Sequence, residues 1–476
     1  MLLFVLVLLP FGMALTLLGV KFWRMTVIVV LVWTLVEGAV RKWVFPAYQA
    51  PILQLKDIAL IAAYAGCLAS NRPRLPAAER NGALAVLTIL QVIYCLAEIL
   101  NPYLPTPLLG FYGFKLYVVY LPLALVIPEI FTTREQIQKL LFWSCISAIP
   151  LGLLGLYQFS QPPTSWINQY VSHEVGQETV VSLFGGRGEG DFRAGRARTS
   201  GTFSYIGGYT TYLLAALSLA LGAILSARRN TRLMLIAGAA FVLALGATFT
   251  TGSRTPVAVF AIVAPMMLLV AGGKGLLPMS AAMRLVAMGT IALAVGGFLF
   301  RDAANAFWFR AENADSTSGR LLSPITETFD AFQTSPLFGT GVGSNANVGA
   351  SLVDPSFYWL DQLYELEPAR VMQDLGIVGF TLLYVAKFWV IWLAMRSLKW
   401  SRSRLFIAMH LAAIAFMVPH VILFTINNAT GGVFFWAFAG ISIAMFRIER
   451  AERRTAAMLA AIQAEPAPTD RQPALA

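Results

Sequence analysis

The sequence predicts an all-α, polytopic membrane protein, a bundle of about 12–13 transmembrane helices with a long, partly helical periplasmic loop. Of its 476 residues, 58% are hydrophobic and only 12% are charged, and the mean hydropathy is +0.69. A soluble protein of this length needs many more charges to cover its surface. The apolar runs, about 16–22 residues each, match the thickness of a bilayer's hydrocarbon core. The shorter alternating segments of a membrane barrel do not occur in the sequence.

The candidate spans follow one another along residues 1–455, which we expect to form a single transmembrane domain. The first run has neither a basic segment before it nor a clear cleavage site, so we interpret it as a retained helix rather than a signal peptide. Residues 456–476 are rich in alanine and proline and are expected to form a disordered cytoplasmic tail. The apolar runs are 2–20, 25–40, 52–70, 82–100, 115–131, 140–159, 206–226, 233–249, 257–272, 285–300, 376–395, 405–426 and 431–446.

Short loops rich in lysine and arginine predict the orientation, because such loops stay in the cytoplasm. These loops are 71–80, 132–139, 227–232, 396–404 and 447–454, and all fall on one side if the spans are right. The C-terminus is then cytoplasmic, and loops 160–205 and 301–375 are periplasmic, as in a multi-pass protein of a bacterial inner membrane. The net charge of +11 is explained by these topology signals, so no nucleic-acid partner is predicted. The three cysteines lie in apolar runs, which predicts neither disulfides nor a metal site.

The stretch FTTGSRTPVAVF, residues 249–260, places an arginine on the periplasmic side, where topology does not require one. Gly252 and Ser253 end one helix, and Pro256 suits the first turn of the next. Arg254 therefore lies at a helix N-terminus, where the free N–H groups and the dipole favour an anion. A guanidinium there makes a pyrophosphate site, because its planar fork binds phosphate oxygens. The alternative is an interfacial arginine that reaches the lipid headgroups.

Five charged residues gather around the periplasmic ends of the second and third runs: Glu37, Arg41, Lys42, Lys56 and Asp57. Glu37 and Arg41 have the i,i+4 spacing of a helical ion pair. Charges at such depth face protein or a wet cavity. They predict a polar cavity open to the outer leaflet, and the alternative is a local ion pair with Trp43 as an interfacial anchor.

The Gly- and Arg-rich segment 185–208 leads into a membrane helix. Arg196 and Arg198 immediately precede SGTFSYIGG, so their side chains can reach the level of the lipid headgroups. A lipid-linked phosphate would lie at that level. The alternative is a flexible, solvated loop.

In the long loop 301–375, Leu321, Leu322, Ile325, Phe329 and Phe332 recur at helical spacing and predict a helix over about 318–333. It would lie on the membrane surface or roof the cavity. PLFGTGVGS then follows with three glycines. No strand–turn–helix context surrounds them, so we interpret them as a tight turn that brings backbone close to the site rather than as a nucleotide-binding fingerprint.

The stretch YELEPARVMQDLGIVGF, residues 364–380, places Glu365, Glu367, Arg370 and Asp374 just before an apolar helix. A glutamate beside an arginine can form a structural pair. It can also be a base that deprotonates a sugar hydroxyl, if burial brings its pKa toward the working pH.

The order of these motifs resembles the O-antigen ligase and polysaccharide polymerase superfamily over about residues 196–380. RTSGTFSYIGG, FTTGSRTPVAVF, SGRLLSPITETFDAFQTSPLFGTGVGS and ELEPARVMQDLGIVGF carry the resemblance by their order and spacing. EGAVRKW, with KD shortly after it, is similar to an exopolysaccharide polymerase-like branch. The ligases commonly carry a His-Asn pair before an E-x-G sequence, and here Asp374-Leu-Gly376 aligns with E-x-G while the histidine position falls near Glu365. The missing histidine favours a polymerase over a ligase.

The resemblance implies a glycosyltransferase that uses a glycan on a polyprenyl diphosphate, such as undecaprenyl diphosphate, with no metal or other cofactor. Arg254, Arg196, Arg198 and Arg320 would then bind the diphosphate. Glu365 or Glu367 would be the base, and Arg370 would assist in the long loop. A chain-length regulator and a flippase of the same pathway are the partners to expect, besides membrane lipid.

Three functions remain open from the sequence. The first is a polymerase that joins lipid-linked repeat units into an exopolysaccharide or O-antigen at the periplasmic face. The second is a ligase that moves a finished glycan to another acceptor. The third is a transporter or flippase, but inverted repeats and midplane charges would be expected there, whereas this chain concentrates its charges and long loops on one face.

Overall fold

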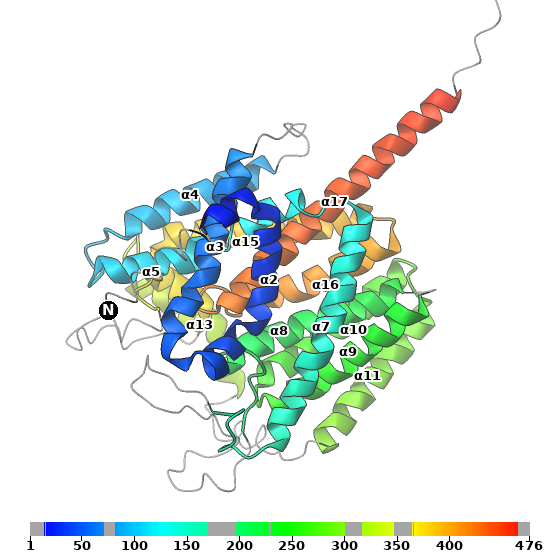
Figure 1. Ribbon diagram of the computed structural model, residues 1–476, viewed down its shortest axis with the longest axis horizontal. Coiled ribbons are helices and arrows are strands. Elements are labelled where there is room, and N and C mark those ends of the chain that lie inside the picture. Colours follow the sequence, from blue (N-terminus) through cyan, green and yellow to red (C-terminus); the bar gives the residue numbers. More distant parts are fainter. Residues whose placement is uncertain are drawn as a thin grey trace, which may run out of the picture.

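The computed structural model describes residues 14, 16–70, 81–169, 197–227, 230–299, 317–346, 364 and 366–464. The side chains of a few helical residues within these ranges, Arg320 among them, are not described. The described ranges fold into helices without a β-strand (Figure 1). Their principal helices are α2 (Trp23–Ala39), α3 (Gln49–Ala69), α4 (Gly82–Glu98), α5 (Pro107–Val118), α6 (Leu123–Val126), α7 (Arg134–Ser160), α8 (Ile206–Ser226), α9 (Thr231–Thr250), α10 (Arg254–Gly273), α11 (Met279–Leu299), α13 (Thr317–Thr334), α15 (Glu367–Trp400), α16 (Arg404–Met417) and α17 (Ala429–Ala464).

Ten helices in the described ranges are long and apolar enough to cross a membrane. One of these spans joins α5 and α6 through a short irregular stretch and ends at Glu129. The shorter apolar helices Gly82–Glu98 and Met279–Ile291 occupy the places of two further predicted spans. The predicted all-α, polytopic membrane fold is thus confirmed. Most of the first predicted span, 2–20, lies outside the described residues.

Contacts between helix ends show which of them lie together at each end of the bundle. Arg134 of α7 bonds Glu452 of α17 at 2.7 Å, and the Arg402 backbone N–H donates to Glu449 at 2.7 Å. Arg404 donates to the carbonyl oxygens of Leu225 and Leu276. The described basic loops therefore gather at one end, as predicted, and we call it the basic end. We call the opposite end, where α2, α9 and α16 finish and α8, α10 and α17 begin, the site end.

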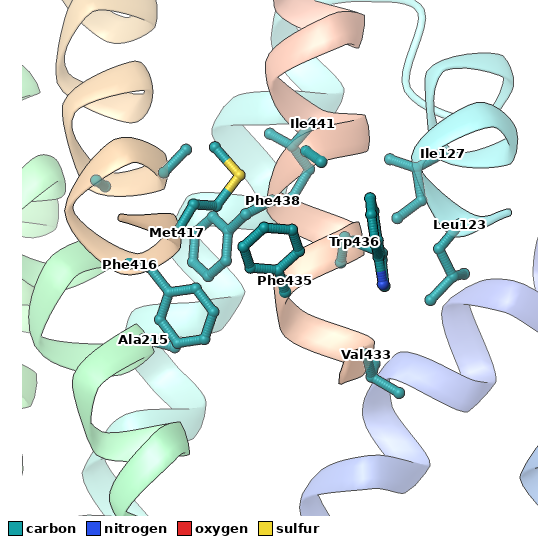
Figure 2. Close-up of a cluster of buried hydrophobic side chains, with 14 of the residues drawn as sticks. Leu123, Ile127, Ala215, Phe416, Met417, Val433, Phe435, Trp436, Phe438 and Ile441 are labelled. Atoms are coloured by element: carbon teal, nitrogen blue, oxygen red, sulfur yellow. The ribbon is translucent and has the colours of Figure 1, made fainter. Parts of the chain in front are cut away.

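The core lies where α17 crosses the middle of the bundle. Phe435, Trp436 and Phe438 of α17 pack between helices from three other parts of the chain (Figure 2). Phe416 and Met417 come from α16, Ala215 from α8, and Leu123 and Ile127 from α6 and the 3₁₀ turn after it. Lipid tails are as apolar as these side chains, so close packing rather than escape from water stabilises the contacts.

Small residues allow α8 and α16 to approach closely. A Cβ placed on Gly222 would lie 3.1 Å from the Ala408 carbonyl oxygen and 3.2 Å from the Ala412 Cβ. Large apolar side chains instead point outward from the bundle, for example Ile93, Val242 and Ile262, which are well exposed. Small residues where two helices approach closely, and large apolar residues on the outer surface, are typical of a membrane bundle.

Helix α17 continues well beyond the bundle, as the red helix in Figure 1 shows. It ends at Ala464, so residues 456–464, which the sequence analysis assigns to the disordered tail, are helical. Alanines dominate this stretch, and they are the strongest helix formers. Residues 465–476 lie outside the described part of the chain.

Candidate active site

Residues 197–204, which we call the strap, join the turn between α9 and α10. The Thr199 backbone N–H donates to the Thr250 carbonyl at 3.2 Å, and the two threonine hydroxyls lie 2.7 Å apart. The Arg198 Nε donates to the Thr251 carbonyl at 2.9 Å. Arg254 is the first residue of α10, three residues further along. Arg198, although far from it in sequence, therefore lies against the turn that leads to Arg254 at the site end.

This contact predicts a disulfide between cysteines placed at positions 199 and 250. The hydroxyls that the thiols replace lie within hydrogen-bond distance, so we expect Thr199→Cys/Thr250→Cys to cross-link under mild oxidation. Polyethylene-glycol maleimide would then fail to modify the pair until reductant is added. The three native cysteines are buried or partly buried, and the parent protein controls for them. A pair that stays fully reactive after oxidation contradicts the strap's position.

The π-helical turn Val40–Val44, which continues α2, holds the strap from the other side. The Lys42 ammonium donates to the Ser200 hydroxyl at 3.1 Å and to the Gly201 carbonyl at 2.7 Å. Arg41 donates to the Ser204 hydroxyl at 3.1 Å. A Cβ on Gly38 would lie 2.4 Å from the strap's backbone, so only glycine permits this approach. The strap is therefore held between the segment that ends α2 and continues to Val44 and the end of α9.

Buried ion pairs connect these cationic side chains to α3 and α5. The Lys56 Nζ lies 2.5 Å from Glu37, and Arg41 lies 3.7 Å from the same carboxylate, as its i,i+4 spacing predicted. Asp57 pairs with Lys115 at 2.8 Å. Tyr120 donates to Asp57 at 2.7 Å.

Counting Lys42, four cationic side chains stand against two carboxylates in this network. All five residues predicted to support the cavity are buried in protein rather than turned to lipid. The cationic excess favours an anion at this end.

The glycine-rich turn folds around Asp374, whose side chain is 2% exposed. The Asp374 carboxylate accepts from the Tyr117 hydroxyl at 2.9 Å, the Ser344 hydroxyl at 2.7 Å and the Asn345 backbone N–H at 2.8 Å. The Asn345 side-chain amide and the Gly343 N–H donate as well. The predicted turn is present, and the group its backbone approaches is this carboxylate. Several donors on one carboxylate hold the turn rigidly.

Helix α15 is broken at Gly376, where φ is 59° and ψ is −170°. The Glu367 carboxylate lies 2.6 Å from the Lys387 ammonium, twenty residues further on. In a straight helix two such residues would be about 30 Å apart. The segment 367–375 therefore folds back along 377–387 as a re-entrant arm.

Arg370 stands on the re-entrant arm between the two buried carboxylates. Its Nε donates to the Tyr364 carbonyl, and its guanidinium lies 5.7 Å from the centre of the Phe424 ring. The Tyr364 hydroxyl donates to Asp330 of α13 at 2.7 Å. Burial, together with Asp330, raises the pKa of Tyr364, so its hydroxyl stays protonated at neutral pH. These bonds tie α13 to the start of α15.

Helix α13 confirms the predicted helix in the long loop, but its apolar side chains face outward. Ala331 is buried against Ala369 and Met372 of the re-entrant arm. Ile325, Phe329 and Phe332 are exposed. The side chains of Leu321 and Leu322 are not described. The outward apolar face is what a helix lying on a membrane surface presents, and that location stays a prediction.

The structure brings most of the predicted residues it describes to the site end. Arg198 lies against the turn that leads to Arg254, and Arg41 and Lys42 hold the strap on its other side. Arg196 and Glu365 lie outside the described residues. Glu367 is present but 0% exposed, with its carboxylate bonded on both oxygens.

Sequence reasoning missed Lys387, the partner of Glu367. An isolated lysine inside the apolar run 376–395 is the signal that would have found it, because an ionisable residue in a membrane span is expected to have a partner. Asp374 was noted among the charged residues before the apolar helix and as part of an aligned motif, but without a role of its own. Nothing local in the sequence predicts its bond with Tyr117, which lies in another helix.

A groove of about 750 Å³ lies between helix ends at the basic end, lined by Arg134, Asn230, Thr231 and Arg404 among others. These residues are at the far end of the bundle from Arg254, so we do not assign the groove to the site. The predicted cavity at the outer leaflet stays a prediction.

Comparison with known families bears directly on this arrangement. Residues 239–384 match the model of a family described as O-antigen ligase. This match supports the O-antigen ligase and polysaccharide polymerase superfamily. The match supports a membrane enzyme of the ligase/polymerase type, and the matching family implies lipid-linked glycan substrates. A comparison with curated proteins gave no match.

The matched segment of the superfamily covers only part of the site. It contains Arg254, the glycine turn, and the re-entrant arm with Glu367 and Asp374. The strap and the α2 charges lie before it. The strap with Arg198 is therefore outside the region that defines the family match, whereas its partners Thr250 and Thr251 are inside it.

Proposed function

We propose that this protein is a membrane glycosyltransferase that polymerises polyprenyl-diphosphate-linked oligosaccharide repeat units into an exopolysaccharide or O-antigen. The observation that carries the proposal is the bond from Arg198 to the turn that leads to Arg254, the first residue of α10, beside the buried cationic network. Arg196 and Arg320, predicted from the sequence, complete the proposed diphosphate site. The positive-inside rule supports a cytoplasmic basic end and C-terminus, and hence a site end on the periplasmic face of a bacterial inner membrane.

The proposed reaction transfers a glycan from its diphosphate to a hydroxyl of the acceptor glycan. The hydroxyl oxygen bonds to the anomeric carbon, and the bond from that carbon to the diphosphate oxygen breaks. The bond's electron pair leaves with the diphosphate, whose growing negative charge the arginines neutralise. The hydroxyl proton passes to a base on the protein.

Of the two glutamates predicted as the base, we carry forward Glu365. The Glu367 carboxylate accepts hydrogen bonds on both oxygens and has no exposed surface, so it would have to break these bonds to reach a hydroxyl. Such enclosure favours a structural role for Glu367. Arg370, whose guanidinium stacks on Phe424, is proposed to orient the acceptor.

The ligase remains the second candidate, because the matching family is described as O-antigen ligase. A ligase would bind the same diphosphate and differ in its acceptor. The missing histidine near Glu365 supports the polymerase. A chain-length regulator and a flippase of the same pathway are proposed partners of either enzyme.

Turnover by purified protein tests the proposal. The protein in detergent or nanodiscs is given one lipid-linked repeat unit, and the products are separated by length on a gel. We expect a ladder of polymers together with released polyprenyl diphosphate. Product formed only when a separate, non-identical acceptor is added identifies a ligase. No transfer to any acceptor, with glycolipid crossing the membrane of reconstituted vesicles, identifies a transporter instead.

A further inference from the structure

The Glu367 carboxylate joins three segments of the chain at one point. One oxygen accepts from the Lys387 ammonium at 2.6 Å and from the Thr425 hydroxyl at 2.7 Å. The other accepts from the backbone N–H groups of Thr425 and Ile426, the latter at 2.6 Å. The carboxylate thus links the re-entrant arm, the middle of α15 and the irregular segment 418–428 between α16 and α17.

Segment 418–428 in turn positions groups of the candidate site. Phe424 lies beneath the Arg370 guanidinium. Asn428 donates to the Gly207 carbonyl at 3.1 Å and to the Thr211 hydroxyl at 2.9 Å, at the start of α8. Helix α8 directly follows the strap that carries Arg198. Through segment 418–428, the Glu367 carboxylate therefore connects Arg370 to the start of α8, and hence to the strap.

Lys387 balances the charge of the Glu367 carboxylate inside the bundle. It lies thirteen residues before the end of α15 at Trp400, so it is about 20 Å from the basic end and inside the hydrocarbon layer. It is 0% exposed, and its ammonium also lies 3.5 Å from the His420 carbonyl. A carboxylate alone at this depth would be costly, and the lysine neutralises it.

We propose that Glu367 and Lys387 are a positioning pair: Glu367 fixes segment 424–428 through its acceptor oxygens, Lys387 neutralises it, and together they set Arg370 relative to the strap. This inference rests on the proposed function for its effect on turnover. The two roles can be tested separately, because the acceptor oxygens of Glu367 and the charge balance of the pair can be removed independently.

Two charge-neutral double variants make the separation. In Glu367→Gln/Lys387→Met, the amide oxygen still accepts from the two backbone N–H groups, and the amide nitrogen can donate to the Thr425 hydroxyl. In Glu367→Ala/Lys387→Met, both N–H groups lose their acceptor. We expect the first to keep turnover within about threefold of wild type and the second to fall by at least about tenfold, mainly through acceptor KM.

The single variants Lys387→Met and Glu367→Gln each leave one buried charge without its partner, and both are expected to express poorly. The Gln/Met double variant restores charge balance and should recover expression. Recovered expression in the double variant would show that each single variant fails because of an unpaired charge, and not because its substitution by itself prevents folding.

A cross-link provides a readout that does not depend on turnover. Cysteines at 211 and 428 replace side chains that lie 2.9 Å apart. We expect their disulfide to form in the Gln/Met background and to form less in the Ala/Met background. Full turnover and cross-linking in both double variants overturns the proposal.

Loss of turnover in the Gln/Met variant with normal cross-linking also overturns it, and would return Glu367 to the role of base. If the wild type makes no polymer while cross-linking follows the expected order, the proposed function fails and the positioning of segment 424–428 stands.

Discussion

Replacing Arg254 with alanine is expected to lower the rate of polymer formation by about 10²–10³-fold, the usual loss when a group that stabilises transition-state charge is removed. The physical reason is the diphosphate, which gains negative charge as the glycan leaves and needs a cation at the N-terminus of α10. Arg254→Lys keeps the charge but not the planar fork, so it should retain part of the rate. The rate is measured with purified protein and a lipid-linked repeat unit.

The matched control for Arg254→Ala is Arg284→Ala. Arg284 is an exposed arginine of α11 on the basic end of the bundle. Its loss removes the same net charge without touching the proposed site, so the rate should stay near that of the wild type. Equal rates for the wild type and both variants would remove Arg254 from the chemistry.

Replacing Gly376 with alanine is expected to have the largest effect on folding. The backbone there has φ of 59°, and a Cβ would lie 2.2 Å from the Leu337 carbonyl oxygen and 2.5 Å from the Gly339 nitrogen. With ψ of −170°, this backbone conformation is essentially restricted to glycine and costs an L-residue about 1–3 kcal/mol, and the clash with fixed backbone adds to it. We expect little monodisperse protein, a lower thermal midpoint and no polymer.

Gly238→Ala in α9 controls for the Gly376 variant. A Cβ at Gly238 meets nothing within 4 Å, and alanine favours a helix interior over glycine by about 1 kcal/mol. The thermal midpoint should therefore hold or rise. If Gly376→Ala behaves like Gly238→Ala in size-exclusion chromatography after heating, the re-entrant break is not as the structure has it.

The helices and their two-ended arrangement could be predicted because apolar runs and basic loops are local signals. The Glu37–Arg41 pair also followed from spacing alone, since i,i+4 side chains meet on any helix. The turn before Arg254 was readable from its glycine and proline for the same reason.

The re-entrant arm could not be predicted from local pattern. Residues 367–375 read as the first turns of the following span, and only the φ of Gly376 reverses their direction. Glu367 consequently contacts Lys387 and segment 425–426 rather than the loop that precedes it. Glu367 was predicted as a base from its neighbours in the sequence, and these are not its contacts in the folded protein.

The sequence left open whether the apolar face of α13 lies on the membrane surface or roofs the cavity, for a related reason. Helical spacing identified its apolar side chains, but periodicity does not say whether such a face meets protein or lipid. Ala331 packs on the re-entrant arm because a small side chain permits close approach, and polar bonds from Tyr364 to Asp330 secure the contact. In a membrane enzyme the larger apolar residues remain available for lipid.

The strap was predicted only as two arginines near the headgroup level. Its contacts with Thr250 and Thr251, and with the end of α2, join segments more than fifty residues apart in the chain. Nothing in the order of the sequence predicts that Lys42 donates to Ser200 rather than to a lipid phosphate.

The most direct test of the central claim is the binding of a polyprenyl diphosphate to purified protein, without any glycan or turnover. We compare the wild type, Arg198→Gln/Arg254→Gln and Arg284→Gln. Two lost charge-assisted contacts should weaken binding by about 100-fold in the double variant, while Arg284→Gln binds as the wild type does. Equal affinity of the wild type and the double variant would contradict the assignment of these arginines to the diphosphate.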